Sequence, residues 1–195
     1  LGLEYVHGEG PSIGRVVAGG EDVARLREVD PADSLPFVFD AVRRTRRELP
    51  ADIPLIGFSG APFTLASYIV EGGGSRNYVA TKTLMYRDPG AWHAMMGLIA
   101  RAVSRYLVGQ VEAGCQALQL FDSWVGCLAP ADYERYVLPH TRAVIESLPR
   151  AIPVIHFGTD TATLLELQAR AGGAVLGVDH KMPIGEACRR FPGLA

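Results

Sequence analysis

The chain has 195 residues, a formal net charge of −2 at pH 7, 48% hydrophobic residues and 21% charged residues. This composition is typical of a globular protein and excludes an intrinsically disordered chain, which would contain fewer apolar residues. No apolar run approaches the ~20 residues of a membrane helix, and Lys and Arg are not in the excess that a nucleic-acid surface needs, so we expect neither a membrane nor a nucleic-acid partner.

The first part of the chain contains an irregular segment followed by a helical pattern. Residues 2–20 are rich in glycine and predict a loop with room for a short hairpin. Apolar residues then recur at helical spacing from Leu35 to Leu49, and Pro50 ends the pattern. The basic run within this helix is expected to form a solvated face. It consists of Arg43, Arg44, Arg46 and Arg47.

Four short apolar stretches predict buried strands, because each is bounded by Gly, Pro, Asp or Ser. Their apolarity is continuous and does not alternate, which is typical of a parallel sheet covered on its faces. The stretches are Ile53–Phe58, Ala117–Phe121, Ile152–Phe157 and Ala174–Val178.

Helical patterns lie between and after these strands, so the chain is predicted to be an α/β protein with a parallel sheet. They begin near Pro62 and cover Pro89–Ala113, Asp132–Leu148, Thr159–Ala171 (capped by Thr159 or Asp160) and Met182–Arg190. Neither GxGxxG nor GxxxxGK[ST] follows a strand, so the usual phosphate-binding marks of a doubly wound sheet are missing. A complete (β/α)₈ barrel needs eight units and ~250 residues. The four units seen here therefore predict either a small four-stranded sheet or half of a barrel.

Candidate site residues follow the strands, because α/β enzymes place their sites at the carboxyl ends of strands. Phe58 and Gly60 come at the end of the first strand, and Tyr68 lies two turns into the next helix. Ser123 follows the second strand. Further polar residues at strand ends are Asp122, Asp160, Asp179, His180 and Lys181.

Each of these residues also has a purely structural interpretation. Tyr68 could be a core residue with its hydroxyl at the rim, and Phe58 could serve packing alone. Asp122 and Ser123 could cap a helix or form a turn. His156 lies within a strand and is predicted to be a hydrogen-bonded buried imidazole. Because the sequence contains no GxSxG, HExxH or Cys/His ligand cluster, it does not favour a hydrolase or a metal site.

The three cysteines form no CxxC pair and are odd in number. A disulfide framework is therefore not expected, and a reducing, cytoplasmic location is predicted. The cysteines are Cys115, Cys127 and Cys188.

Four blocks of sequence resemble the uroporphyrinogen decarboxylase family. The two most specific are GFSGAPFTLASYIVEGG (57–73) and YLVGQVEAGCQALQLFDSWVG (106–126). PVIHFGTDT (153–161) and GVDHKMP (177–183) follow in the order of the family. The resemblance covers essentially the whole chain. It implies a (β/α)₈ TIM barrel, of which residues 1–195 form a single partial domain holding roughly strands 3 to 6 and their helices.

The resemblance also implies an activity, namely decarboxylation of the four acetate side chains of uroporphyrinogen III to give coproporphyrinogen III in haem biosynthesis. Family members work as cytoplasmic homodimers with no metal or organic cofactor. By resemblance, Tyr68 is a catalytic and substrate-binding residue, and Ser123, Phe58 and Gly60 bind substrate. We expect Tyr68 and Ser123 to face one cavity at the carboxyl ends of the strands.

The chain departs from the family pattern at both ends. The RQAGRY arginine motif, the catalytic aspartate and the C-terminal GNLDP and GHG blocks are not found, so the chain is expected to be the middle of the enzyme and to be inactive alone. Its open sheet edges are expected to favour association with another copy. Two alternatives remain. One is a cobamide-dependent methyltransferase, although its His-x-Cys pair is replaced by His156-Phe157-Gly158, and the other is a non-catalytic tetrapyrrole-binding relative.

Overall fold

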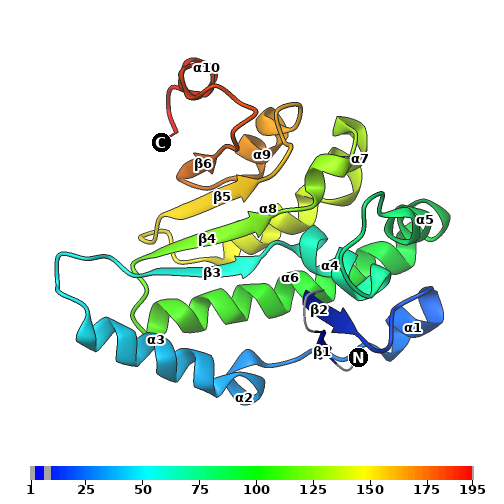
Figure 1. The fold of residues 1–195 in the computed structure, drawn as a ribbon, viewed down its shortest axis with the longest axis horizontal. Helices are drawn as coiled ribbons and strands as arrows, with labels where there is room; N and C mark the ends of the chain where they lie inside the picture. The colour runs from blue at the N-terminus through cyan, green and yellow to red at the C-terminus, as the bar shows by residue number, and fades with distance from the viewer. Residues whose placement is uncertain (1–2, 7–9, 195) are drawn as a thin grey trace.

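A four-stranded parallel sheet in the order β3-β4-β5-β6 forms the centre of the molecule (Figure 1). The structure is a computed structural model that describes residues 3–6 and 10–194. The predicted parallel sheet in sequence order is confirmed, although the first strand begins at Ile56 and not at Ile53. The strands are β3 Ile56–Gly60, β4 Ala117–Asp122, β5 Val154–Gly158 and β6 Val175–Gly177.

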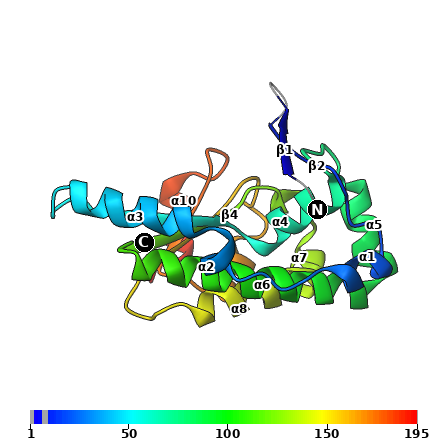
Figure 2. The same cartoon turned by 90° about the horizontal axis from the view of Figure 1, so that it is seen from below.

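Helices connect the strands, and a hairpin precedes them. The predicted loop at the start of the chain contains two antiparallel strands, β1 Leu3–Val6 and β2 Gly10–Ile13, and the turn at residues 7–9 lies outside the described residues. In Figure 2 this hairpin stands out from the body of the molecule. The helices are α1 Gly20–Arg25, α2 Pro31–Ser34, α3 Pro36–Glu48, α4 Pro62–Glu71, α5 Val79–Arg87, α6 Pro89–Glu112, the 3₁₀ turn η1 Val125–Cys127, α7 Pro130–Tyr136, α8 Leu138–Ser147, α9 Leu165–Ala171 and α10 Ile184–Arg190.

The two faces of the sheet differ in burial. Leu118 and Leu120 of β4 point to one face and are fully buried, because α6 and α8 run along this side (Figure 2). The opposite face carries Ile56 and Phe58 of β3, whose exposed fractions are 47% and 60%. One face is therefore packed on helices and the other is open, as in one sector of a barrel whose inner face is not covered.

The long helix α6 supplies much of the core. Asp88 caps its start by accepting a hydrogen bond from the backbone N–H of Ala91 at 2.9 Å, and Pro89 occupies its first turn. Trp92 and Leu107 are fully buried at opposite ends of the helix. Burying a large apolar side chain contributes about 1.5–3 kcal/mol, so this helix is a main source of stability.

One predicted helix is divided in two. The pattern over 132–148 predicts a single helix, whereas α7 ends at Tyr136 and α8 begins at Leu138. Val137 joins them outside the helical region, at φ −121°. Pro139 explains the break, because a proline has no backbone N–H and its ring would clash with the carbonyl four residues earlier.

A second predicted helix begins later than expected. The pattern predicts a helix from Thr159, but α9 begins at Leu165 and neither Thr159 nor Asp160 caps it. Asp160 instead adopts the left-handed conformation at φ 60°, and its N–H donates to the Asp179 carboxylate at 2.7 Å. A contact with the loop after β6 therefore overrides the local preference. The last helix, α10, likewise begins at Ile184 and not at Met182.

Side chains occupy part of the β3 edge, which was expected to be open. The amide of Gln110 in α6 accepts from the backbone N–H of Phe58 at 3.1 Å and donates to its carbonyl at 3.0 Å. Gln110 thus takes the place of a neighbouring strand at this residue. Arg46 also departs from its predicted solvated role, since it donates to the carbonyls of Ile53 and Pro50 at 2.6 Å.

The outer helices α6 and α8 are linked by a pair of histidines. His93 Nδ1 and His140 Nε2 are 2.8 Å apart, and the two rings stack with centroids 5.1 Å apart. Burial, together with the neighbouring His93, lowers the pKa of His140 to about 4.

In the described part of the chain, no helix is at once long enough and apolar enough to span a bilayer.

Candidate active site

The carboxyl ends of β3, β4 and β5 lie side by side because the strands are parallel and in register. Gly60 pairs with Phe121, and Asp122 pairs with Gly158. Figure 1 shows α4, α5 and α7 gathered at this end of the sheet. The residues that follow the strands therefore meet at one edge, which we call the carboxyl edge.

Tyr68 and Ser123 lie at the carboxyl edge, as the sequence predicts. Tyr68 is in α4, and its half-buried ring packs edge-on against Trp124, with centroids 6.0 Å apart. Ser123 is half-buried and immediately precedes Trp124. Tyr68 thus packs against the residue that follows Ser123, which brings the two predicted site residues close to each other.

Tyr78 joins the same cluster, although the sequence analysis did not single it out. Its ring lies 5.9 Å from that of Trp124, on which Tyr68 also packs. Tyr78 has a positive φ of 52°, an uncommon conformation for a bulky residue, and its N–H donates to Ser75 Oγ at 3.1 Å. Burial raises the pKa of its hydroxyl above the usual value. Strain of this kind often marks functional sites.

Phe58 and Gly60 lie on the open face of the sheet. Phe58 packs edge-on against Phe121 at 5.9 Å, and Phe121 packs in the same way against Phe157. These three rings form an aromatic row across β3, β4 and β5. Gly60 ends β3, and a Cβ there would lie 2.9 Å from the Leu65 side chain. The row offers a broad apolar surface next to the carboxyl edge.

Asp122 points away from the open face and is fully buried. Its Oδ1 accepts a hydrogen bond from Thr64 Oγ1 at 3.1 Å, and its Oδ2 has no partner among the described residues. Burial raises the pKa of this carboxyl to about 7, although the Thr64 hydrogen bond opposes the rise. Near neutral pH, Asp122 therefore still holds its proton in part of the molecules.

The other two strand-end aspartates are engaged within the protein. Asp160 forms an ion pair with Lys181. Asp179 accepts hydrogen bonds from the backbone N–H groups of Asp160 and Lys181, at 2.7 and 2.9 Å. Gly126 packs against the same loop so closely that a Cβ would lie 2.4 Å from the Thr159 carbonyl oxygen. The loops after β4, β5 and β6 are thereby held together.

His156 is buried but is not hydrogen-bonded, which corrects the sequence prediction. It lies on the helix-covered face of β5, and neither ring nitrogen has a hydrogen-bond partner in the described structure. Burial lowers its pKa to about 4. The imidazole is therefore neutral at physiological pH.

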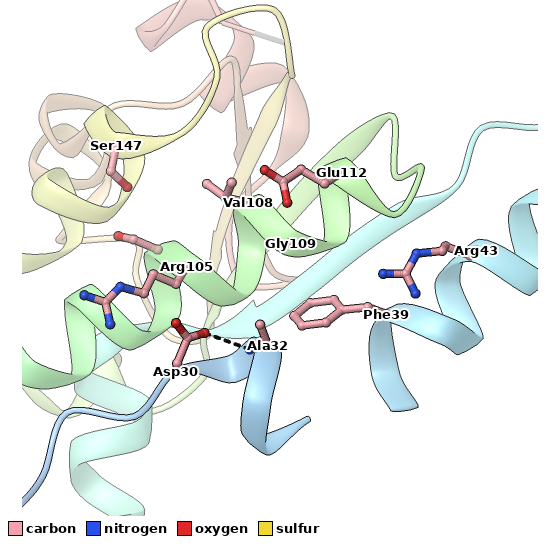
Figure 3. Close-up of a pocket in the computed structure, with 10 residues that line it drawn as sticks. Asp30, Ala32, Phe39, Arg43, Arg105, Val108, Gly109, Glu112 and Ser147 are labelled. Atoms are coloured by element: carbon pink, nitrogen blue, oxygen red, sulfur yellow. Dashed lines mark hydrogen bonds between the residues drawn. The ribbon is translucent and has the colours of Figure 1, made fainter. Parts of the chain in front are cut away.

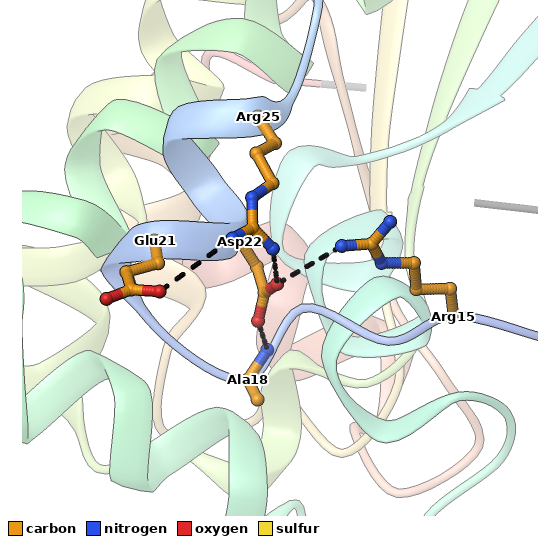
Figure 4. A network of polar contacts seen from close by, with 5 residues as sticks. All are labelled: Arg15, Ala18, Glu21, Asp22 and Arg25. Atoms are coloured by element: carbon orange, nitrogen blue, oxygen red, sulfur yellow. Dashed lines mark hydrogen bonds and ion pairs between the residues drawn. The ribbon is translucent and has the colours of Figure 1, made fainter.

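Three arginines gather around α1: Arg15 precedes the helix, Arg25 ends it and Arg27 follows it. Arg15, Arg25 and Arg27 line a hollow of about 450 Å³, and Asp22 pairs with the first two at 3.9 and 3.5 Å (Figure 4). The segment before α1 runs beside α4, because the N–H of Val17 donates to the Ile69 carbonyl at 3.1 Å. The sequence does not predict this group, because three arginines spread over a short helix and its flanks form no periodic pattern.

A further hollow of about 470 Å³ lies between α2, α3 and α6, where Phe39 and Gly109 face each other (Figure 3). Arg43, Arg105 and Glu112 also line it. None of the sequence-predicted site residues contributes to this hollow, so it is not part of the candidate site.

Comparison with known proteins identifies one family. The uroporphyrinogen decarboxylase (URO-D) family model matches residues 1–194. The chain is 50% identical over 188 residues to a uroporphyrinogen decarboxylase of Carboxydothermus hydrogenoformans and 52% identical over 189 residues to one of Sorangium cellulosum. In both cases the match covers 96% of this chain and 54% of the relative, so the chain spans about half the length of the curated relatives it matches.

Among solved structures, the chain is similar to a methyltransferase from Methanosarcina mazei. The TM-score is 0.79 at 15% sequence identity, and the match covers 100% of this chain and 56% of that structure. At this identity the likeness concerns the fold alone. The fold of the family is a TIM barrel. The four-stranded parallel α/β sheet of this chain corresponds to about half of such a barrel, as the sequence predicts.

Proposed function

Because the chain belongs to the uroporphyrinogen decarboxylase family, we propose that the protein carrying it converts uroporphyrinogen III to coproporphyrinogen III by removing CO₂ from four acetate side chains. The observation that carries this proposal is the match of the family model over residues 1–194, together with about 50% identity to proteins of that name. We further propose that residues 1–195 form one partial barrel domain.

In this proposal, Tyr68, Ser123, Phe58 and Gly60 contact the substrate. The Tyr68 hydroxyl acts at the reacting pyrrole, and the Ser123 hydroxyl hydrogen-bonds to a substrate carboxylate. Phe58, which is 60% exposed on the open face, offers an apolar surface for a pyrrole ring. Gly60 has no side chain, so the Leu65 side chain packs beside the strand end and Gly60 meets the ring through its backbone.

The charge state of the carboxyl edge supports the binding of an anionic substrate. Uroporphyrinogen carries eight carboxylates, and free aspartates at the site would repel them. Asp122 is buried with a raised pKa, and Asp160 is paired with Lys181. Asp179 already accepts two backbone N–H groups. Each aspartate at the carboxyl edge is therefore partly protonated, paired with a cation or hydrogen-bonded within the protein, which reduces its repulsion of an anionic substrate.

The substrate itself can serve as the electron acceptor in this reaction. Protonation of a pyrrole carbon gives a cation. When the bond to the carboxylate breaks, its electron pair forms an exocyclic double bond to the ring, and CO₂ leaves. A proton then adds to the exocyclic carbon to form the methyl group, and the ring carbon loses its extra proton. The protein has to orient the acetate, move protons and stabilise the developing positive charge.

We extend the proposal to cofactors and assembly, following the family resemblance. The protein works in the cytoplasm as a homodimer, with no metal and no organic cofactor. Sedimentation of the purified protein tests the dimer, because a monomer at micromolar concentration would contradict it. Elemental analysis of the same sample tests the metal.

The decisive test is an anaerobic assay of coproporphyrinogen formation, with the 195-residue chain and the protein at its full natural length compared side by side. We expect turnover by the longer protein and none by the chain alone, since the chain spans about half of its relatives. Turnover by the chain would show that its own residues suffice. A folded but inactive longer protein would favour a non-catalytic tetrapyrrole-binding role instead.

A further inference from the structure

We propose that Thr64 and Asp122 are positioning residues that fix Tyr68 relative to Ser123 at the carboxyl edge. The inference concerns two buried side chains that do not themselves face the open side of the sheet. Its consequence for turnover rests on the proposed function, whereas its consequence for the structure does not.

The first step is the contact between Thr64 and the end of β4. Thr64 lies in the first turn of α4 and is almost fully buried. Its hydroxyl donates to Asp122 Oδ1 at 3.1 Å and accepts from the backbone N–H of Trp124 at 3.4 Å. One hydroxyl thus contacts the residues on both sides of Ser123.

The second step is the geometry of α4. Tyr68 follows Thr64 by four residues, so the two side chains lie on the same face of the helix, one turn apart. The Tyr68 ring packs on the Trp124 ring. Thr64 and Tyr68 of α4 therefore both contact residues that flank Ser123.

A backbone hydrogen bond supports the same arrangement. The N–H of Ala61, just before α4, donates to the carbonyl of Phe121 at 2.9 Å. This bond fixes the start of the helix, and the buried side chains of Phe63 and Ala66 hold the helix against the core. The Thr64 hydroxyl adds a directional attachment to the segment 122–124, one turn before Tyr68.

The chemistry of the link favours a role in geometry over one in stability. A buried carboxyl costs free energy unless its hydrogen bonds are complete, and Asp122 Oδ2 has no partner in the described structure. An apolar pair of similar size would stabilise this region at lower cost. What such a pair could not supply is a directional contact that holds α4 to the segment 122–124.

The structural part of the inference can be tested on the chain with fluorine NMR. The chain has two tryptophans, and incorporation of 5-fluorotryptophan gives one resonance for each. Trp92 is fully buried and donates from Nε1 to the Tyr136 carbonyl at 2.9 Å, so it serves as an internal reference. We expect Thr64→Val to shift or broaden the Trp124 resonance and Thr64→Ser to restore it.

A matched control is available in Thr141 of α8. This threonine is fully buried, and its hydroxyl has no hydrogen-bond partner among the described residues. Thr141→Val makes the same chemical change without touching the link and should leave the Trp124 resonance in place. If Thr64→Val does not fold, Thr64→Ala provides a second variant that lacks the hydroxyl.

The functional part is measured in the protein at its full natural length. We expect Thr64→Val to lower kcat by about tenfold or more while KM changes less, since a misplaced group affects the chemical step more than binding. Thr64→Ser should recover most of the rate, and Thr141→Val should equal the wild type.

The outcomes separate the inference from the proposed function. An inactive wild type would defeat the proposed function, and the fluorine spectra would still decide whether the link positions Trp124. An active wild type whose Thr64→Val variant matches Thr141→Val in both rate and spectrum would overturn the positioning role alone.

Discussion

Replacing Asp122 by asparagine should make the stability of the chain less dependent on pH. The folded state raises the pKa of this carboxyl to about 7 because it is buried, whereas the ordinary value is 3.8. A raised pKa means that the folded state binds the proton more tightly than the unfolded state. The stabilisation is complete below pH 3.8 and is lost as the pH rises through about 7.

The size of the effect follows from the two pKa values. The full difference corresponds to about 4 kcal/mol, at 1.36 kcal/mol per pKa unit. Between pH 5 and pH 8, the wild type should lose about 2.5 kcal/mol of unfolding free energy from this group alone. Asparagine keeps a carbonyl that can accept from the Thr64 hydroxyl but does not ionise, so the variant should not show this loss.

The assay is urea unfolding of both proteins at pH 5 and pH 8, followed by circular dichroism. The quantity of interest is the difference between variant and wild type, in which groups common to both cancel. Asp33→Asn, which makes the same substitution at an exposed position of α2, is the matched control. An equal difference between Asp122→Asn and wild type at both pH values would refute the reasoning.

Three further predictions follow from the same structure. Tyr68→Phe should lower kcat/KM of the full-length protein by about tenfold, the equivalent of one hydrogen bond, and an unchanged steady-state rate would remove Tyr68 from the site. Burial lowers the pKa of His156 from 6.5 to about 4, so the unfolding free energy of the wild type falls as the pH drops below 6.5. Between pH 7.5 and pH 5, the unfolding free energy of His156→Leu should therefore rise by about 2 kcal/mol relative to that of the wild type in urea titrations. Parallel pH dependences of the two proteins would contradict this assignment. Gly126→Ala should lower the unfolding free energy by about 1–3 kcal/mol, because its Cβ would lie 2.4 Å from the carbonyl oxygen of Thr159 and 2.7 Å from that of Asp160; an unchanged melting temperature would mean that the loops separate easily.

The sheet could be predicted from the sequence because its signals are local. Continuous apolar runs between Gly, Pro, Asp and Ser mark the strands, and the alternation with helices sets the parallel order. The placement of Tyr68 and Ser123 at one edge then follows, since parallel strands end on the same side. Whether these two residues bind substrate remains a prediction.

The features that were not predicted depend on contacts between distant parts of the chain. Asp160 is held by a carboxylate nineteen positions later, which delays the start of α9. Gln110 satisfies the backbone of Phe58 from a helix that is remote in sequence. The polar link from Thr64 to Asp122 spans 58 positions. No periodicity encodes such pairings.

The histidine pair between α6 and α8 has a consequence for tautomers. Because His93 Nδ1 and His140 Nε2 share one hydrogen bond, only one of these two nitrogens carries a proton in the neutral pair. The ring that donates carries its proton on the nitrogen at this contact, and the ring that accepts carries its proton on the other nitrogen. A first added proton keeps the bond intact, whereas a second places N–H groups face to face and breaks it. Nitrogen-15 chemical shifts of the two imidazoles would assign the donor directly.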